Sequence, residues 1–389
     1  GYSATQMNQA NITASDAKSA GYLLFALKEG GYTTSELYGA NYTALEMKND
    51  GFTDPEELIN VGYTLQNIYD ASFDAGLLLA LQYTASQLKT VGYNASQLKT
   101  GGYDSQQLKT AEFTALQLKN ANYTATSMFQ SGFTASEMKV ASFTSAQLKT
   151  AGYSASSMKS ATFTASQLRT GGYSTDELKT ATFTLSEIKA GGYNVASVKS
   201  LYTLQELKDV SYTVTELKSH YVVQDIVDVG FNASEVYTGG YSVSEMRSVN
   251  FTAGEMLPLV SNSITTLKTG GYTLSEFKTE TSLTVAQLKS HYTAGQFKSA
   301  GYSIGQLRGN NDFSVSQLRV TGGYNATEMK TANVSSVDVN DGGYTLYSII
   351  QGGYTTTELH DADYTVSELV NEGLDSTDVY NGGYNVAEM

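Results

Sequence analysis

One phrase of about ten residues recurs along nearly the whole chain, and this period constrains the fold more than any other feature of the sequence. The stretch 151–200 shows it clearly: residues 152–159 read GYSASSMK, 162–169 read TFTASQLR and 172–179 read GYSTDELK. About 39 such phrases account for the 389 residues. Self-similarity at a short fixed period is typical of repeat architectures, in which each unit packs only against its neighbours.

Each phrase carries the signals that start and stop a short helix. In the phrase at 183–189, Thr184 is a suitable N-cap, and Glu187 three residues later completes a capping box. Phe183 before the cap and Ile188 at the fourth helical position form a hydrophobic staple. The glycines at 191–192 can adopt the left-handed conformation that ends a helix. Each phrase therefore predicts a helix of about two turns followed by a tight turn.

Geometry excludes two other backbones. In a continuous helix, ten residues turn through about 1000°, so the aromatic positions would wind around the helix axis. In a strand, the aromatic residue and the leucine five positions later would point to opposite faces. A two-turn helix is too short to be stable alone in water, so it must pack against neighbours. We therefore predict an all-α solenoid, or superhelix, of about 39 short helices, one per repeat.

The stretch 143–193 alternates with a period of twenty residues. The aromatic position alternates between Phe and Tyr, and the residue before it alternates between Ser or Thr and Gly. This alternation favours two helices per coil of the solenoid, as a hypothesis. The predicted core combines each aromatic residue with the large apolar residue five positions later. In this stretch it comprises Phe143, Leu148, Tyr153, Met158, Phe163, Leu168, Tyr173, Leu178, Phe183, Ile188 and Tyr193.

The unbroken repeat predicts one continuous array over residues 1–389, although this length would ordinarily fold as two or three globular domains. Residues 1–82 are less regular, 83–200 are the most regular, and 201–389 contain spacings of nine and eleven residues. The intervals 193–202, 212–221 and 283–292 are one residue short and 313–324 is one residue long, which predicts altered turns. The last phrase, 384–389, stops inside its predicted helix, so we expect a segment of a longer repeat protein.

No pattern in the sequence predicts catalysis, a metal site or a bound cofactor. The chain has no Cys, no phosphate-binding loop, no nucleophile elbow and no His-Glu-x-x-His. His220, His291 and His360 lie far apart in the repeat, and a role in filling turns is favoured for them. The Glu of the capping box is often replaced by Gln, as at Gln87 and Gln147, which keeps the cap and removes the charge a cation needs. We expect no enzyme.

Charge argues against nucleic acid as a partner. The formal net charge is −14, and the row of lysines that includes Lys89, Lys99 and Lys139 is interpreted as a solvated face near the helix C-termini. Residues 84–220 hold 13 Lys and Arg against 9 Asp and Glu, whereas ten acids and no Lys or Arg follow Lys330. This asymmetry suggests staggered or head-to-tail contacts between copies. No apolar run approaches the roughly 18–20 residues that span a membrane.

Eight Asn-x-Ser/Thr sequons occur in the chain, although the fixed Ser and Thr positions of the repeat would produce some by composition alone. Five of them, at Asn11, Asn41, Asn122, Asn250 and Asn333, precede the aromatic position, in a turn where a glycan could be accommodated. The sequons at Asn94, Asn232 and Asn325 are less favoured.

The phrase G-[YF]-[ST]-x-x-[EQ]-[LM]-[KR] resembles the decapeptide tandem-repeat arrays of microbes and large viruses. Its style is also similar to that of fibre-forming repeat proteins of environmental microbes, some of them expected to be glycosylated. The resemblance covers nearly the whole chain and implies an architecture; no catalytic residue comes with it.

Three functions are compatible with such an array. The leading hypothesis is a structural protein that contributes to an extended filament, extracellular or on a cell or virion surface, through end-to-end or lateral assembly of copies. The alternative is a scaffold whose tyrosines, 29 in the chain, bind protein or glycan ligands. Ice binding through the regular Thr positions is a third option.

Overall fold

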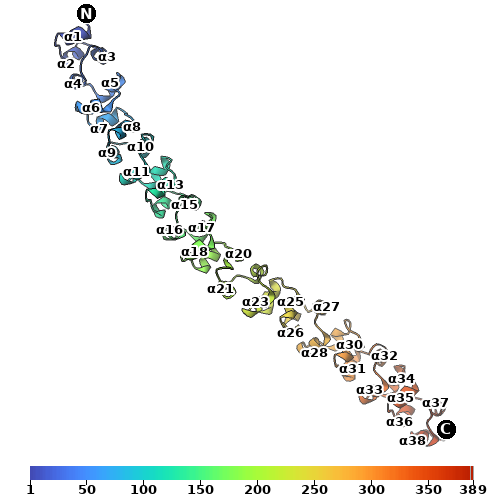
Figure 1. The fold of residues 1–389 in the computed structure, drawn as a ribbon. Coiled ribbons are helices and arrows are strands. Elements are labelled where there is room, and N and C mark those ends of the chain that lie inside the picture. The colour runs from blue at the N-terminus through green and yellow to red at the C-terminus, as the bar shows by residue number, and fades with distance from the viewer. Residues whose placement is uncertain (386, 389) are drawn as a thin grey trace. The chain divides into compact units, whose positions relative to one another are not determined.

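The computed structural model describes residues 1–385 and 387–388, which form 38 short α-helices, one 3₁₀-helix and no strand (Figure 1). The chain divides into two compact units, Gly1–Thr203 and Leu204–Met389. Within each unit the helices follow one another in chain order (Figure 1). The helix predicted after Tyr384 falls partly on residues 386 and 389, outside the described residues. The prediction of an all-α repeat solenoid is confirmed.

Nearly all helices have six residues. The first unit contains α1 (Ala4–Gln9), α2 (Ala14–Ser19), α3 (Leu24–Glu29), α4 (Thr34–Gly39), α5 (Ala44–Asn49), α6 (Pro55–Asn60), α7 (Leu65–Asp70), α8 (Ala75–Ala80), α9 (Ala85–Thr90), α10 (Ala95–Thr100), α11 (Ser105–Thr110), α12 (Ala115–Asn120), α13 (Ala125–Gln130), α14 (Ala135–Val140), α15 (Ser145–Ala151), α16 (Ala155–Ser160), α17 (Ala165–Thr170), α18 (Thr175–Thr180), α19 (Leu185–Ala190) and α20 (Val195–Val198).

The second unit contains α21 (Leu204–Asp209), α22 (Val214–Leu217), α23 (Val223–Asp228), α24 (Ala233–Thr238), α25 (Val243–Ser248), α26 (Ala253–Leu259), α27 (Ile264–Thr269), α28 (Leu274–Glu280), α29 (Val285–Leu288), α30 (Ala294–Ser299), α31 (Ile304–Arg308), η1 (Gly309–Asn311), α32 (Val315–Val320), α33 (Ala326–Thr331), α34 (Ser336–Asp341), α35 (Leu346–Gln351), α36 (Thr356–Asp361), α37 (Val366–Asn371) and α38 (Ser376–Asn381).

The predicted capping box starts most of these helices. At α19, the Thr184 hydroxyl accepts from the Glu187 N–H, and the Glu187 carboxylate accepts from the Thr184 N–H at 2.7 Å. Gln performs the same role at α15, where Gln147 Oε1 accepts from the Thr144 N–H at 2.9 Å. The interpretation that Glu and Gln occupy this position as caps is therefore confirmed.

The aromatic residue of each phrase serves two helices at once. At the end of α18, Thr182 is left-handed with φ +64°, and the Phe183 N–H donates to the Leu178 carbonyl at 3.0 Å. This six-to-one bond is the one that closes a Schellman motif. Phe183 is also the residue before the cap of α19, so its ring is buried between the end of one helix and the start of the next.

Interactions between residues 20 to 24 positions apart show that two helices make one coil. The Tyr173 hydroxyl, for example, donates to the Tyr153 carbonyl at 2.7 Å. Helix α16 likewise packs against α18, the helix two places along. The structure places all eleven residues of the predicted core in the interior. Each of the five aliphatic residues, Leu148, Met158, Leu168, Leu178 and Ile188, has no exposed side-chain surface, and the six aromatic residues are at most 8% exposed.

The altered turns predicted at the nine-residue spacings are confirmed. The helices α20, α22 and α29 each have only four residues, and the stretches that follow them, 199–203, 218–222 and 289–293, have five residues in place of the usual four. The Tyr202 and Tyr221 N–H groups donate to the Val198 and Leu217 carbonyls, four residues back, whereas Phe183 donates to a carbonyl five residues back. At the long interval 313–324, α32 keeps six residues and the extra residue lies in the turn at 321–323.

Candidate functional site

A lysine near the end of many of the helices reaches the carboxyl end of the helix two places along. Lys139 of α14 donates from Nζ to the Ala161 and Thr162 carbonyls beyond α16, both at 3.0 Å. The ammonium group also lies 4.8 Å from the centre of the Phe163 ring. Helix C-termini carry unsatisfied carbonyls and partial negative charge, so a cation there is stabilised by hydrogen bonds, by the dipole and by the ring face. We call this arrangement the lysine clamp.

The lysine clamp recurs in both units. Donation to a turn carbonyl and contact with the aromatic ring about 24 residues along occur together at Lys18, Lys28, Lys48, Lys89, Lys99, Lys109, Lys119, Lys139, Lys149, Lys159 and Lys179, and then at Lys208, Lys218, Lys268, Lys278, Lys298 and Arg319. The interpretation of the lysine row as a solvated face is therefore wrong. The lysines do interact favourably with a helix dipole, but the dipole is that of a helix in the next coil.

Turn residues and capping acids extend the clamp. The left-handed Thr162 accepts from Lys139 Nζ through its hydroxyl at 2.8 Å, which gives this strained β-branched residue a role that Gly lacks. At some places an acidic capping residue 28 positions along pairs with the lysine, as in Lys149–Glu177 at 2.9 Å. The backbone and hydroxyl of Thr184 hold the pKa of Glu187 below its ordinary value through hydrogen bonds to the carboxylate.

A second set of ties points in the opposite direction along the chain. Tyrosine hydroxyls donate to the backbone carbonyl about 20 residues earlier, as Tyr93 does to Phe73 at 2.8 Å and Tyr354 does to Val334 at 2.8 Å. We call this series the tyrosine ladder. Desolvation by burial raises the pKa of these tyrosines, to about 12 at Tyr63, Tyr93, Tyr123, Tyr153, Tyr173 and Tyr193 in the first unit and at Tyr272, Tyr344, Tyr354 and Tyr384 in the second.

Aromatic side chains replace the lysine at three places in the first unit. Tyr38, Tyr69 and Phe129 pack edge-on against Tyr63, Tyr93 and Tyr153, with ring centres 4.7, 4.9 and 4.7 Å apart. The ring of the next coil is thus covered whether the side chain above it is a cation or another ring.

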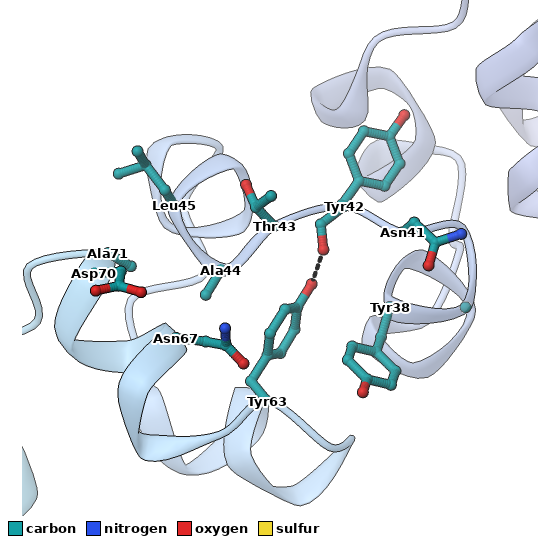
Figure 2. A pocket seen from close by; sticks show the side chains of 11 residues that line it. Tyr38, Asn41, Tyr42, Thr43, Ala44, Leu45, Tyr63, Asn67, Asp70 and Ala71 are labelled. Carbon is teal, nitrogen blue, oxygen red and sulfur yellow. Dashed lines mark hydrogen bonds between the residues drawn. The ribbon is translucent and has the colours of Figure 1, made fainter. Parts of the chain in front are cut away.

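A shallow groove recurs beside the clamp, between the turn and N-cap of one helix and the outer face of the helix two places along. One of these grooves, of about 620 Å³, lies between α5 and α7 (Figure 2). In Figure 2 the Tyr63 side chain points to the Tyr42 carbonyl, with Asn67 on one side and Tyr38 on the other. Grooves of about 430 to 570 Å³ occupy the same place in other coils, for example the one lined by Lys159, Phe183 and Glu187. The sequence analysis did not find these grooves.

The predicted glycosylation sites fall into two structural classes. Asn11, Asn41, Asn122, Asn250 and Asn333 all lie in exposed left-handed turns, with φ between 55° and 67°. Asn94, Asn232 and Asn325 are also exposed, but they are N-caps whose side-chain oxygens accept from the backbone of their own helices.

The histidines lie apart from one another in the second unit. His220 and His291 are in turns, and the His360 ring packs edge-on against Tyr384 at 4.4 Å, in the position that lysine occupies in the clamp. Within the described part of the chain, no three His, Asp or Glu side chains are grouped so as to hold a metal ion. None of the described helices has the length and hydrophobicity that crossing a bilayer requires.

Comparison with known proteins identifies the repeat. The family described as "Decapeptide repeat region" matches residues 1–75, 54–125, 82–155 and 122–195, which together span the first half of the chain. No curated protein matches the sequence.

The lysine clamp can be tested by replacing Lys139 with Met, which keeps the apolar stem and removes the charge. We expect Lys139→Met to lower the free energy of unfolding by about 1–2 kcal/mol, because charged hydrogen bonds to the α16 turn are lost at a half-exposed site. Hydrogen exchange should quicken first at the amides of α14 and α16. Lys199→Met is the matched control, since no hydrogen bond or ring contact of the Lys199 ammonium occurs among the described residues; equal effects of the two changes would contradict the clamp.

The tyrosine ladder predicts a loss of stability at alkaline pH. Tyrosines in the unfolded chain have a pKa near 10, whereas burial raises the pKa of ladder members such as Tyr93 and Tyr173 to about 12. The unfolded state therefore releases protons first, and the stability present below pH 10 should fall as pH rises from 10 to 12. Urea unfolding over this range, with tyrosinate absorbance recorded in parallel, measures the effect. Tyr153→Phe and Tyr173→Phe should flatten the pH dependence, and an unchanged slope would argue against the ladder.

Proposed function

Because this chain belongs to the decapeptide repeat family, we propose that it contributes to an extended filament that lies outside the cell or on a cell or virion surface. The chain is a structural repeat protein, with one short capped helix for nearly every ten residues. The observation that carries the proposal is the recurrence of the lysine clamp at the same position in coil after coil. We propose a purely structural role, with no catalysis and no cofactor, because the polar side chains of the repeat are engaged in caps and ties.

Assembly with other copies is the second part of the proposal. Successive coils present nearly the same lysines, tyrosines and turn carbonyls, so a coil of one copy is chemically suited to a coil of another. Contacts that repeat in one direction without closing generate filaments, either end to end or side by side. In an end-to-end row, the last coil of one copy and the first coil of the next would be joined by the same kinds of hydrogen bond that join successive coils within one copy.

Charge distribution supports lateral, staggered contacts between copies. Residues 84–203 carry eleven Lys and Arg against six Asp and Glu, whereas residues 331–388 carry ten acids and no Lys or Arg. Attraction between exposed charges is screened within about 10 Å at 0.1 M salt. We do not propose nucleic acid as a partner, because the formal net charge of the chain is −14.

Salt dependence of assembly tests this proposal. The purified protein should form filaments in negative-stain images at low ionic strength and fewer of them at 0.5 M NaCl, and the triple variant D361N/D363N/E372Q should assemble more weakly at low salt. These three acids belong to the acidic stretch and make no side-chain ion pair among the described residues. Monodisperse particles at every salt concentration would reject self-assembly, and filaments indifferent to salt and to the variant would reject the charge argument.

We also propose that the five turn sequons at Asn11, Asn41, Asn122, Asn250 and Asn333 carry N-linked glycans, in keeping with an extracellular location. Their exposed left-handed turns leave the asparagine side chains outside the capping network, unlike those of Asn94, Asn232 and Asn325. The intact mass of native material should exceed that of the bare polypeptide. Peptide mapping should then find more sugar on the asparagines in turns than on the asparagines that are N-caps. A native mass equal to that of the bare chain would refute glycosylation.

A further inference from the structure

The groove between α5 and α7 differs from the other grooves of the solenoid in its side chains. Tyr38 stands where Lys159 stands in the groove of α17 and α19, Asn67 replaces Glu187, and Asp70 replaces Ala190. Substitutions in two helices, α4 and α7, thus meet in one groove of about 620 Å³, compared with about 570 Å³ for the groove of α17 and α19. That volume lies within the range of sites for small ligands.

Tyr38 gives the groove an aromatic wall that is held in place. Its ring packs edge-on against Tyr63, with centres 4.7 Å apart, and its hydroxyl donates to the Gly62 carbonyl at 3.2 Å. The side chain is nevertheless 39% exposed, whereas Tyr63 beneath it is buried. Leu45, 48% exposed, extends the apolar surface on the far side of the turn.

Asn67 and Asp70 supply oriented polar groups opposite this wall. They are three residues apart in α7 and therefore share one face of the helix. Asn67 Oδ1 accepts from the N–H and the hydroxyl of Thr64 at 2.9 and 2.8 Å, which fixes the amide and leaves its NH₂ group without an acceptor among the described residues. Asp70 accepts from Gln66 through Oδ1 only, so Oδ2 remains available as an acceptor.

We propose that this groove binds a neutral saccharide through one pyranose ring. The C–H face of a pyranose is weakly positive and apolar, and it complements the negative face of the Tyr38 ring. A donor amide next to an acceptor carboxylate matches a pair of neighbouring sugar hydroxyls, each of which donates and accepts. A phosphorylated or acidic ligand would be repelled by Asp70, and a metal ion would find one carboxylate where it needs several oxygen ligands. The inference does not depend on filament formation.

The repeat itself supplies a test variant that should fold. Tyr38→Lys, Asn67→Gln and Asp70→Thr together restore residues that occupy the same positions in other coils, such as Lys89, Gln87 and Thr90. Glu187→Gln, in the groove of α17 and α19, is the matched control. The protein should be produced without glycosylation, so that no sugar attached to Asn41, which lines the groove, contributes to the measured shifts.

Two-dimensional NMR titration of the full chain with maltotetraose, cellotetraose, mannotetraose and xylotetraose measures the binding. We expect saturable shifts of the Asn67 side-chain amide with at least one of these sugars at millimolar concentration, unchanged in E187Q. The triple variant should keep its thermal stability and bind at least about tenfold more weakly. Absence of saturable shifts with all four sugars, or equal binding by the triple variant, would overturn the proposal.

Discussion

Everything in this solenoid follows from the unsatisfied carbonyls at the end of each very short helix. A helix of six residues has four carbonyls without a partner of its own, so most of its acceptors must be satisfied from outside. The aromatic N–H of the turn satisfies one, as Phe183 does for Leu178, and the lysine of the helix two places back satisfies the turn carbonyls beyond it. The amino end is served by the capping box within the same phrase. A single helix is therefore incomplete until the preceding coil is in place, which explains how marginal helices stabilise one another within each unit.

The helices and their caps could be predicted because the residues that form them are close in sequence. Thr184 and Glu187 are three residues apart, and the bond between them does not depend on how the helices stack. The lysine clamp joins Lys139 to carbonyls 22 and 23 residues away. In a ten-residue repeat, an offset of 4, 14, 24 or 34 residues from a lysine always ends on an aromatic position, so periodicity alone does not identify the ring that the lysine covers. The number of helices per coil determines which ring the lysine covers. In the sequence, only the alternation at 143–193 indicated two helices per coil.

Single departures from the repeat were harder to interpret than the repeat itself. The nine-residue interval at 193–202 predicts an altered turn, but it does not show how the helix and the turn share the change. The helix α20 loses two residues, and the Tyr202 N–H closes its end by donating to the Val198 carbonyl. Tyr38 likewise looks unrelated to Asn67 and Asp70, which lie in a different phrase. They become one feature only when α4, α5 and α7 are brought together, because the groove is built from two successive coils (Figure 2).

The opposed directions of the clamp and the ladder also constrain how such a gene can change in length. Gain or loss of one ten-residue phrase would move every later helix to the other side of its coil. Turns such as Thr162, whose hydroxyl accepts from the Lys139 ammonium, would then exchange places with turns such as Gly172. Gain or loss of two phrases leaves every partner in register. Unequal crossing-over should therefore be tolerated mainly in steps of twenty residues, and descendants of one ancestral array should differ by whole coils.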